Sequence, residues 1–216
     1  MVKEKFEGPF SSDHYRREDD APDPYFYSQP RLVVHIDDCA IEAIGEFFAE
    51  YLPEAGWILD LMSSWRSHMP EGFSGRKLVG LGLNGIEMVE NLLLDGRVIH
   101  DLNLNPVLPF REASFDAAVV TVSVQYITKP VQLFSEVARV LGAGASFHVI
   151  YSNRMFPTKA TALWKSLSDA DRAKLVSAYF RYAGGWEEPE TRDISPRPGF
   201  YTDPVFVVSA RKRDGG

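Results

Sequence analysis

The most constraining feature of this sequence is an alternation of short apolar runs with helical patterns between residues 57 and 151. Each run is short and apolar, as expected of a buried strand, and the fourth is the most strongly β-branched. The predicted strands are Trp57–Leu61, Lys77–Leu83, Arg97–His100, Phe115–Val124 and Ala145–Tyr151. Strands that alternate with helices are joined by right-handed crossovers, so the sequence predicts an α/β fold with a mostly parallel sheet.

Helical spacing of apolar residues predicts five helices, and boundary signals mark four of them, as two examples show. Pro130 stands in the first turn of one helix and Gly142 just past its end. Asn84, with Glu87 three residues on, resembles a capping box at the start of another. The predicted helices span residues 37–52, 84–94, 130–141, 157–167 and 168–182, and a last strand is predicted over Pro204–Ala210.

Residues 1–36 are predicted to form an N-terminal arm on a single α/β domain of residues 37–216. The arm is rich in charge, proline and aromatic residues. Aromatic rings gain from burial, so Tyr25, Phe26 and Tyr27 are expected to lie against the core. The region before the first strand can cover the ligand-binding edge of such a sheet, so we expect the arm to act as a lid. The alternative is a tail that covers apolar surface elsewhere.

Composition and charge limit the kinds of function. The 216 residues are 45% hydrophobic and 25% charged, the balance of one folded domain. The net charge of −7 argues against non-specific binding to nucleic acid or to an anionic membrane. No apolar run approaches the roughly 18 residues that cross a bilayer, and no secretory signal is seen. The single cysteine, Cys39, fits a reducing compartment, so we expect a cytoplasmic protein with a small-molecule substrate; the oligomeric state stays open.

One segment carries a family resemblance. It begins with Leu-Pro-Phe at 108–110 and Ser-Phe-Asp at 114–116, and ends in a helix with Glu-Val-Ala-Arg-Val-Leu-Gly-Ala-Gly at 136–144. This order resembles class I S-adenosylmethionine-dependent methyltransferases of the type 11, or ubiquinone/menaquinone-methyltransferase-like, branch over roughly residues 55–152. The resemblance implies a Rossmann-like seven-stranded sheet in the order 3-2-1-4-5-7-6, with strand 7 antiparallel and helices on both faces. It also implies S-adenosylmethionine as cofactor.

The family binds its cofactor beyond the carboxyl ends of the strands, where the strand order reverses. Matching these strand ends gives ten expected cofactor-binding residues: Asp60, Met62, Ser63, Ser64, Gly82, Leu83, Asn84, Asp101, Leu102 and Ser123. Met62, Ser64 and Arg66 stand where the family has three glycines, which let the backbone approach the cofactor. The loop after the first strand must therefore take another path, or the ligand must sit differently.

The acid that grips the ribose is also replaced, because Gly82 stands at its position. Asn84 is the nearest polar substitute, although a plain helix cap is an equal alternative. Asp101 and Leu102 stand where an acid and an apolar neighbour usually meet the adenine; the alternative is an aspartate in an exposed turn.

Methyl transfer from a sulfonium depends mainly on orienting donor and acceptor, so a general base is needed only if the acceptor loses a proton. Base candidates are His35 and Tyr126, and packing is the alternative role of each. Substrate contacts are expected from Gln125, Tyr126, Asn153 and Arg154, with Arg154 suited to an anionic acceptor. Cys39 and the five histidines show no metal-ligand spacing.

Four further segments resemble a plant and bacterial subset of methyltransferase-like proteins with a degenerate glycine motif: Pro30–Asp38, Leu59–Trp65, Gly82–Asn84 and Ser152–Phe156. Two functions stay open. One is S-adenosylmethionine-dependent methyl transfer to a small molecule. The other is a catalytically inactive methyltransferase-like protein that acts as a ligand-binding or regulatory subunit. A nicotinamide-dependent oxidoreductase is disfavoured because its glycine fingerprint is missing.

Overall fold

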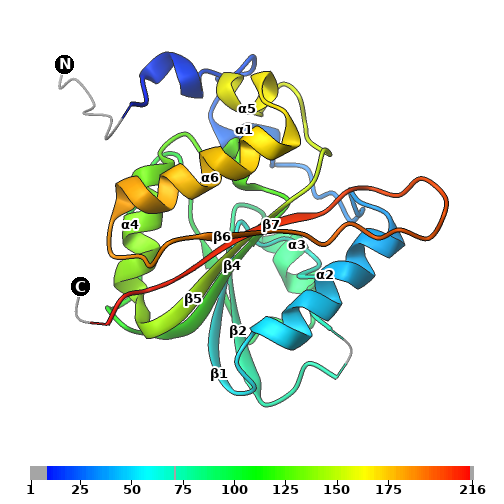
Figure 1. Ribbon diagram of the computed structural model, residues 1–216, viewed down its shortest axis with the longest axis vertical. Coiled ribbons are helices and arrows are strands. Elements are labelled where there is room, and N and C mark those ends of the chain that lie inside the picture. The colour runs from blue at the N-terminus through cyan, green and yellow to red at the C-terminus, as the bar shows by residue number, and fades with distance from the viewer. Residues whose placement is uncertain (1–8, 71, 215–216) are drawn as a thin grey trace.

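The computed structural model describes residues 9–70 and 72–214, and its strands form one seven-stranded sheet (Figure 1). The strand order is β3-β2-β1-β4-β5-β7-β6. The strands are β1 Gly56–Leu61, β2 Arg76–Gly82, β3 Gly96–Ile99, β4 Phe115–Thr121, β5 Leu141–Tyr151, β6 Glu190–Asp193 and β7 Phe206–Arg211. Strands β1 to β5 pair in parallel, whereas β7 is antiparallel to both β5 and β6. The predicted fold class is therefore confirmed.

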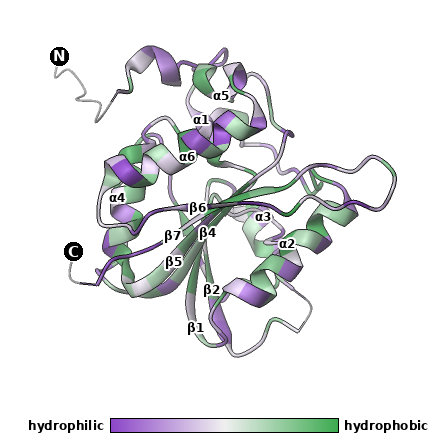
Figure 2. Ribbon diagram, in the orientation of Figure 1, coloured by the Kyte–Doolittle hydropathy of each residue, from purple (hydrophilic) through white to green (hydrophobic). Residues whose placement is uncertain are grey.

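Helices cover both faces of the sheet (Figure 1). They are η1 Ser12–Tyr15, α1 Asp23–Phe26, α2 Asp38–Tyr51, α3 Gly85–Glu90, η2 Val124–Tyr126, α4 Pro130–Val140, α5 Ala162–Ser166 and α6 Asp169–Ala183. On one face Phe48 of α2 and Met88 of α3 join a buried cluster with strand residues. On the other, Phe134 of α4 packs 4.7 Å from Phe180 of α6, measured between ring centroids. The central strands are hydrophobic because both faces are covered, and α2 turns a hydrophobic stripe inward (Figure 2).

Two predicted helices are shorter than expected. The helix predicted over 84–94 ends at Glu90, because the Asn91 side chain accepts a hydrogen bond from the backbone of Leu93. The helix predicted over 157–167 is reduced to α5, and the backbone N–H of Thr161 donates to the carbonyl of Gln125 instead. Side-chain and tertiary hydrogen bonds thus replace the helical ones. Among the described residues, no helix is both long and apolar enough to span a membrane.

Two strand predictions also need correction. The fourth strand ends at Thr121 and not at Val124, because Val122 has a φ of 50°, in the left-handed region. The edge strand β6 is not predicted, since its sequence Glu-Thr-Arg-Asp is polar and all four residues are exposed. A polar edge strand carries no apolar alternation for a sequence pattern to detect.

The N-terminal arm is folded, and its first eight residues lie outside the described part of the chain. It contains η1 and α1, and Tyr15 is buried with its ring 6.4 Å from that of Tyr179. Phe26 lies 5.3 Å from Phe156, whereas Tyr25, expected against the core, is 75% exposed. The arm therefore shares the domain's core through η1 and α1.

A cluster of buried polar groups joins the arm to the loops after β3 and β5. Asp23, on α1, is 4% exposed and accepts hydrogen bonds from Arg17 at 2.7 and 3.0 Å and from Asn103 at 2.7 Å. The fully buried Lys159 places its Nζ 3.2 Å from Asp23 and 3.1 Å from Asp19. We call these five residues the arm cluster. Buried charges are tolerated when they are paired and hydrogen-bonded, so the cluster fixes the arm in one position.

Replacing Lys159 tests this role. Lys159→Met removes one of the two cations beside Asp23 and the Nζ donor to the carbonyls of Asp19 and Ala21, so we expect the free energy of unfolding to fall by about 1–3 kcal/mol. Urea denaturation followed by circular dichroism measures the change. The matched control is Lys174→Met, because Lys174 is 79% exposed in a surface pair with Asp171 and should change stability by at most about 0.5 kcal/mol. Equal stability of both variants and the wild type would contradict the proposed anchoring.

Candidate functional site

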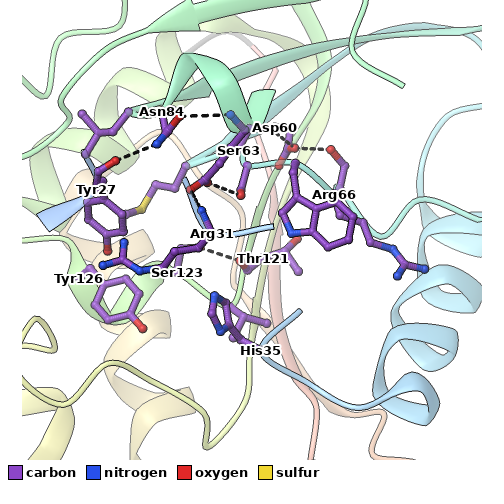
Figure 3. Close-up of a pocket in the computed structure, with 18 of the residues that line it drawn as sticks. Tyr27, Arg31, His35, Asp60, Ser63, Arg66, Asn84, Thr121, Ser123 and Tyr126 are labelled. Atoms are coloured by element: carbon purple, nitrogen blue, oxygen red, sulfur yellow. Dashed lines mark hydrogen bonds between the residues drawn. The ribbon is translucent and has the colours of Figure 1, made fainter. Parts of the chain in front are cut away.

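A cavity of about 260 Å³ opens beyond the carboxyl ends of β1 to β4. Its lining comes from the arm, from the loops after β1, β2, β3 and β4, and from the segment after β5 (Figure 3). Strand β1 pairs with β2 on one side and β4 on the other, so the strand order reverses at this edge. Open α/β sheets bind ligands at such a point, which makes this cavity the candidate site.

Asp60, near the end of β1, is a buried carboxylate with no cation beside it among the described residues. It is 3% exposed, and its Oδ2 accepts hydrogen bonds from Ser63 at 2.7 Å and Ser67 at 2.6 Å. Burial raises the pKa of Asp60 from 3.8 to about 6, although the two hydroxyls act in the opposite direction. No ion pair to Asp60 is found in the described part of the chain, so this carboxylate favours a positively charged ligand group.

The sequence did not determine the path of the loop after β1, and the structure shows it. Met62, at the first glycine position, has a φ of 56°, the left-handed conformation that glycine adopts most easily. The backbone N–H of Ser63 then donates to the carbonyl of Leu81 at 2.9 Å. A Cβ atom on Gly82 would lie 2.2 Å from the Ser63 carbonyl oxygen. The loop therefore fills the space where the missing acid would project.

Glu87, on α3, is the buried acid next to the end of β2. Its Oε1 accepts from the backbone N–H of Arg31 at 2.7 Å and its Oε2 from the Ser64 hydroxyl at 2.6 Å. The helix cap is Asn84, whose Oδ1 accepts from two backbone N–H groups and whose Nδ2 donates to the carbonyl of Tyr27. Glu87 is thus free of the capping-box role that its spacing predicts, and it faces the cavity.

Three buried side-chain atoms in the cavity lining have no hydrogen-bond partner among the described residues. They are Nη1 of Arg31, Nδ1 of His68 and Oγ1 of Thr121. Buried polar atoms are almost always satisfied, so three orphaned atoms around one cavity point to a polar ligand. Next to Thr121, the left-handed Val122 stores backbone strain, which persists mainly at functional sites.

Comparison with known proteins identifies the fold. A family model for the methyltransferase domain matches residues 86–149, from α3 to β5. Phosphoethanolamine N-methyltransferase 2 of Haemonchus contortus, solved with S-adenosyl-L-methionine, aligns with a TM-score of 0.57 at 13% identity, over 80% of this chain and 52% of that chain. This chain therefore spans about half the length of the Haemonchus enzyme. It has the class I methyltransferase fold.

Two further structures show the range of this fold. An S-adenosylmethionine-dependent methyltransferase of Mesorhizobium loti aligns with a TM-score of 0.54 at 16% identity, over 79% of this chain and 98% of that chain. The [4+2]-cyclase SpnF aligns with a TM-score of 0.60 at 14% identity, over 89% and 92%. A search among curated proteins gave no significant match. The methyltransferase fold alone does not fix the reaction, which has to be argued from the site.

All ten expected cofactor residues of this methyltransferase fold line the cavity. Of the four expected substrate residues, Tyr126 and Arg154 line the cavity, whereas Gln125 and Asn153 do not. Gln125 is buried and donates to the carbonyl of Val122 at 2.9 Å, and Asn153 is exposed outside the cavity. Arg154 bonds Asp203 at 2.7 Å, so its charge is already offset.

The two base candidates differ in protonation. Tyr126 accepts a hydrogen bond from the backbone of Phe156 at 2.8 Å, and burial raises its pKa above the usual 10.0. The phenol thus stays protonated near neutral pH and cannot serve as a base there. Partial burial and the nearby Arg31 lower the pKa of His35 below 6.5, so its imidazole is neutral at pH 7 and can accept a proton.

Sequence reasoning gave no site role to Glu87 or Thr121, which also line the cavity. It placed Arg31 only within the arm predicted as a lid and within the Pro30–Asp38 segment of the subset resemblance, without a role of its own. No group of three or more metal-binding side chains is found in residues 9–70 and 72–214.

The Ser63 backbone lies so close to Gly82 that a side chain at position 82 should displace the loop and not restore the missing acidic contact to the ribose. Gly82→Ala should lower the free energy of unfolding by about 1–3 kcal/mol through overpacking against the Ser63 backbone, as measured by thermal or urea denaturation. The matched control is Gly142→Ala, where the nearest atom to a new Cβ is a carbonyl oxygen at 3.6 Å. A Gly82→Asp variant that is as stable as the wild type would refute this loop path.

The buried carboxylate of Asp60 predicts a pH-dependent stability. Because its pKa is raised in the folded state, the unfolded chain loses its proton first, and stability falls as the pH rises from about 4 to 6. Asp60→Asn should therefore be more stable than the wild type at pH 7–8, by on the order of 2–3 kcal/mol. The advantage should vanish near pH 4.

Urea denaturation at several pH values measures this difference. The exposed Asp13→Asn variant serves as control and should show almost no difference from the wild type at any pH. A difference between Asp60→Asn and the wild type that stays constant from pH 4 to pH 8 would show that this carboxylate is not desolvated.

Proposed function

We propose that the cavity binds S-adenosylmethionine and that the protein transfers its methyl group to a small-molecule acceptor. The observation that carries this proposal is Asp60, a buried carboxylate whose side-chain partners among the described residues are two hydroxyls, at the switch point of a methyltransferase fold. S-adenosylmethionine has an ammonium and a sulfonium group, and either would supply the missing positive charge. The fold of the Haemonchus enzyme, solved with this cofactor, supports the same assignment.

The nucleoside half of the cofactor would lie over Gly82–Asn84 and Asp101–Leu102. Oδ1 of Asp101 accepts from the backbone of Asn103 and Leu104, which orients the carboxylate and leaves Oδ2 for the adenine amino group. Glu87 would grip the ribose in place of the acid missing at Gly82. Each of its oxygens accepts one bond and keeps a second lone pair.

When bound, S-adenosylmethionine supplies an electrophilic methyl group, and the task of the chain is to orient the acceptor and exclude water. We propose that the arm is the lid for this purpose, because Tyr27, Arg31 and residues 33–36 form one wall of the cavity. His35 on this wall would take the proton of an acceptor that must lose one. A cytoplasmic location belongs to the same proposal and rests on the single cysteine.

A catalytically inactive, ligand-binding protein is the second candidate. The observation in its favour is the Ser63 carbonyl beside Gly82, which removes the usual acidic contact to the ribose. The two candidates differ in turnover. Incubation with methyl-labelled S-adenosylmethionine and a deproteinised metabolite extract should transfer label to a small molecule if the protein is an enzyme.

Cofactor binding is tested by titration with S-adenosylhomocysteine, followed by calorimetry or by tryptophan fluorescence, to which Trp65 in the cavity lining contributes. Asp101→Asn keeps the Oδ1 bonds of the turn but places an amide donor opposite the adenine amino group. We expect it to weaken binding by about tenfold or more. The matched control is Asp95→Asn, at the opposite end of β3, which should bind normally. If Asp101→Asn binds S-adenosylhomocysteine with unchanged affinity, the adenine does not lie beside Asp101.

A further inference from the structure

Arg31 brings a positive charge to the cavity, but nothing in the described chain neutralises it. Its backbone N–H donates to Glu87, whereas its guanidinium makes no hydrogen bond or ion pair to any described residue, and Nη1 is buried. A guanidinium carries five N–H donors and no acceptor, so its hydrogen bonds have to come from outside the described residues. Arg31 as a whole is half-buried, and its buried Nη1 is the atom that lacks an acceptor, which is costly unless a ligand supplies one.

Aromatic rings hold this guanidinium in place. The Cζ atom of Arg31 lies 4.5 Å from the ring centre of Phe26, 5.6 Å from Phe156 and 5.9 Å from Tyr27. Such contacts stabilise the cation and restrict its orientation, but they offer no oxygen to accept its N–H groups. The group is therefore preorganised for a ligand that brings acceptors.

Neither Asp23 nor Glu87, two acids of the cavity lining, pairs with the Arg31 guanidinium. Asp23 is bound by Arg17, Asn103 and Lys159 of the arm cluster. Glu87 accepts from the Ser64 hydroxyl and from the Arg31 backbone. Arg154, the arginine that the sequence suggested for an anion, has Asp203 as its counter-ion. Arg31 is thus the better placed cation for an anionic ligand.

The position of Arg31 separates it from the expected place of the cofactor's amino-acid end. Its guanidinium packs on Phe156, which follows β5 and bonds Tyr126 after β4. Asp60 lies with Ser63 at the β1 loop, on the other side of the cavity from Tyr126 (Figure 3). An anion on Arg31 would therefore belong to the second ligand, the methyl acceptor.

We propose that the methyl acceptor is a small anion whose carboxylate or phosphate is bound by Arg31, an inference that rests on the proposed function. The planar guanidinium fork matches either oxyanion with two parallel hydrogen bonds. Phe26, Tyr27 and Phe156 around it suit an acceptor with an apolar or aromatic body. His35, whose ring lies 4.9 Å from that of Phe156, stands beside the same ligand.

The test measures binding of benzoate and phenyl phosphate, with neutral benzamide as the matched probe, to the full chain with and without S-adenosylhomocysteine. We expect both wild-type states to prefer at least one anion over benzamide, and the stronger anion shows which oxyanion the site favours. Arg31→Met should weaken the binding of that anion by tenfold or more and leave the affinity for benzamide unchanged. Arg31→Lys, which keeps the charge but loses the fork, should give an intermediate loss.

The control is Arg66→Met, since Arg66 is an exposed arginine of the same cavity lining and should change anion affinity by less than threefold. Equal losses in the Arg31 and Arg66 variants, or no preference for an anion in the wild type, would overturn the proposal. So would an Arg31→Met variant that loses affinity for S-adenosylhomocysteine but not for 5′-methylthioadenosine, which lacks the amino-acid carboxylate. Failure of the wild type to bind S-adenosylhomocysteine would instead count against the proposed function.

Discussion

The site depends on the hydrogen bonds that converge on Asp23. This carboxylate accepts from Arg17 and Asn103 and lies beside Lys159, so it joins the arm to the loops after β3 and β5. Asn103 extends the connection by donating to the carbonyl of Tyr126 after β4. Without this connection the arm would not cover the sheet edge, which would be open to solvent. Water would then screen the charge of Arg31, which now packs against aromatic rings.

The fold was largely predictable because the core obeys simple periodicities. Buried parallel strands such as β4 have a continuous apolar run, here residues 117–120, and α4 repeats apolar residues at helical spacing, so their patterns are clear. Prediction failed where other forces set the backbone. Strand β6 is polar because it lies at an edge, and the chain before α5 is held by Lys159 rather than by helical hydrogen bonds.

The sequence predicted where the candidate site lies in the fold, but not how its loops and side chains are arranged. The family resemblance identified the strand ends that line the cavity, since the fold dictates where these meet. It could not show that Met62 adopts the conformation of a glycine, because a side-chain residue seldom does so. Nor could it identify Glu87 or Arg31. Glu87 has the spacing of a capping residue, and Arg31 reaches the cavity only through tertiary contacts of the arm.

The arm cluster also has a consequence for the order of events during synthesis. Asp23 leaves the ribosome early, whereas Lys159 follows only after all five parallel strands. Contacts between distant parts of a chain form slowly, because the loop between them must first be closed. The nascent protein would therefore assemble these strands with the cavity edge of the sheet uncovered. The arm can dock, and the cavity acquire its last wall, only when the segment after β5 has emerged.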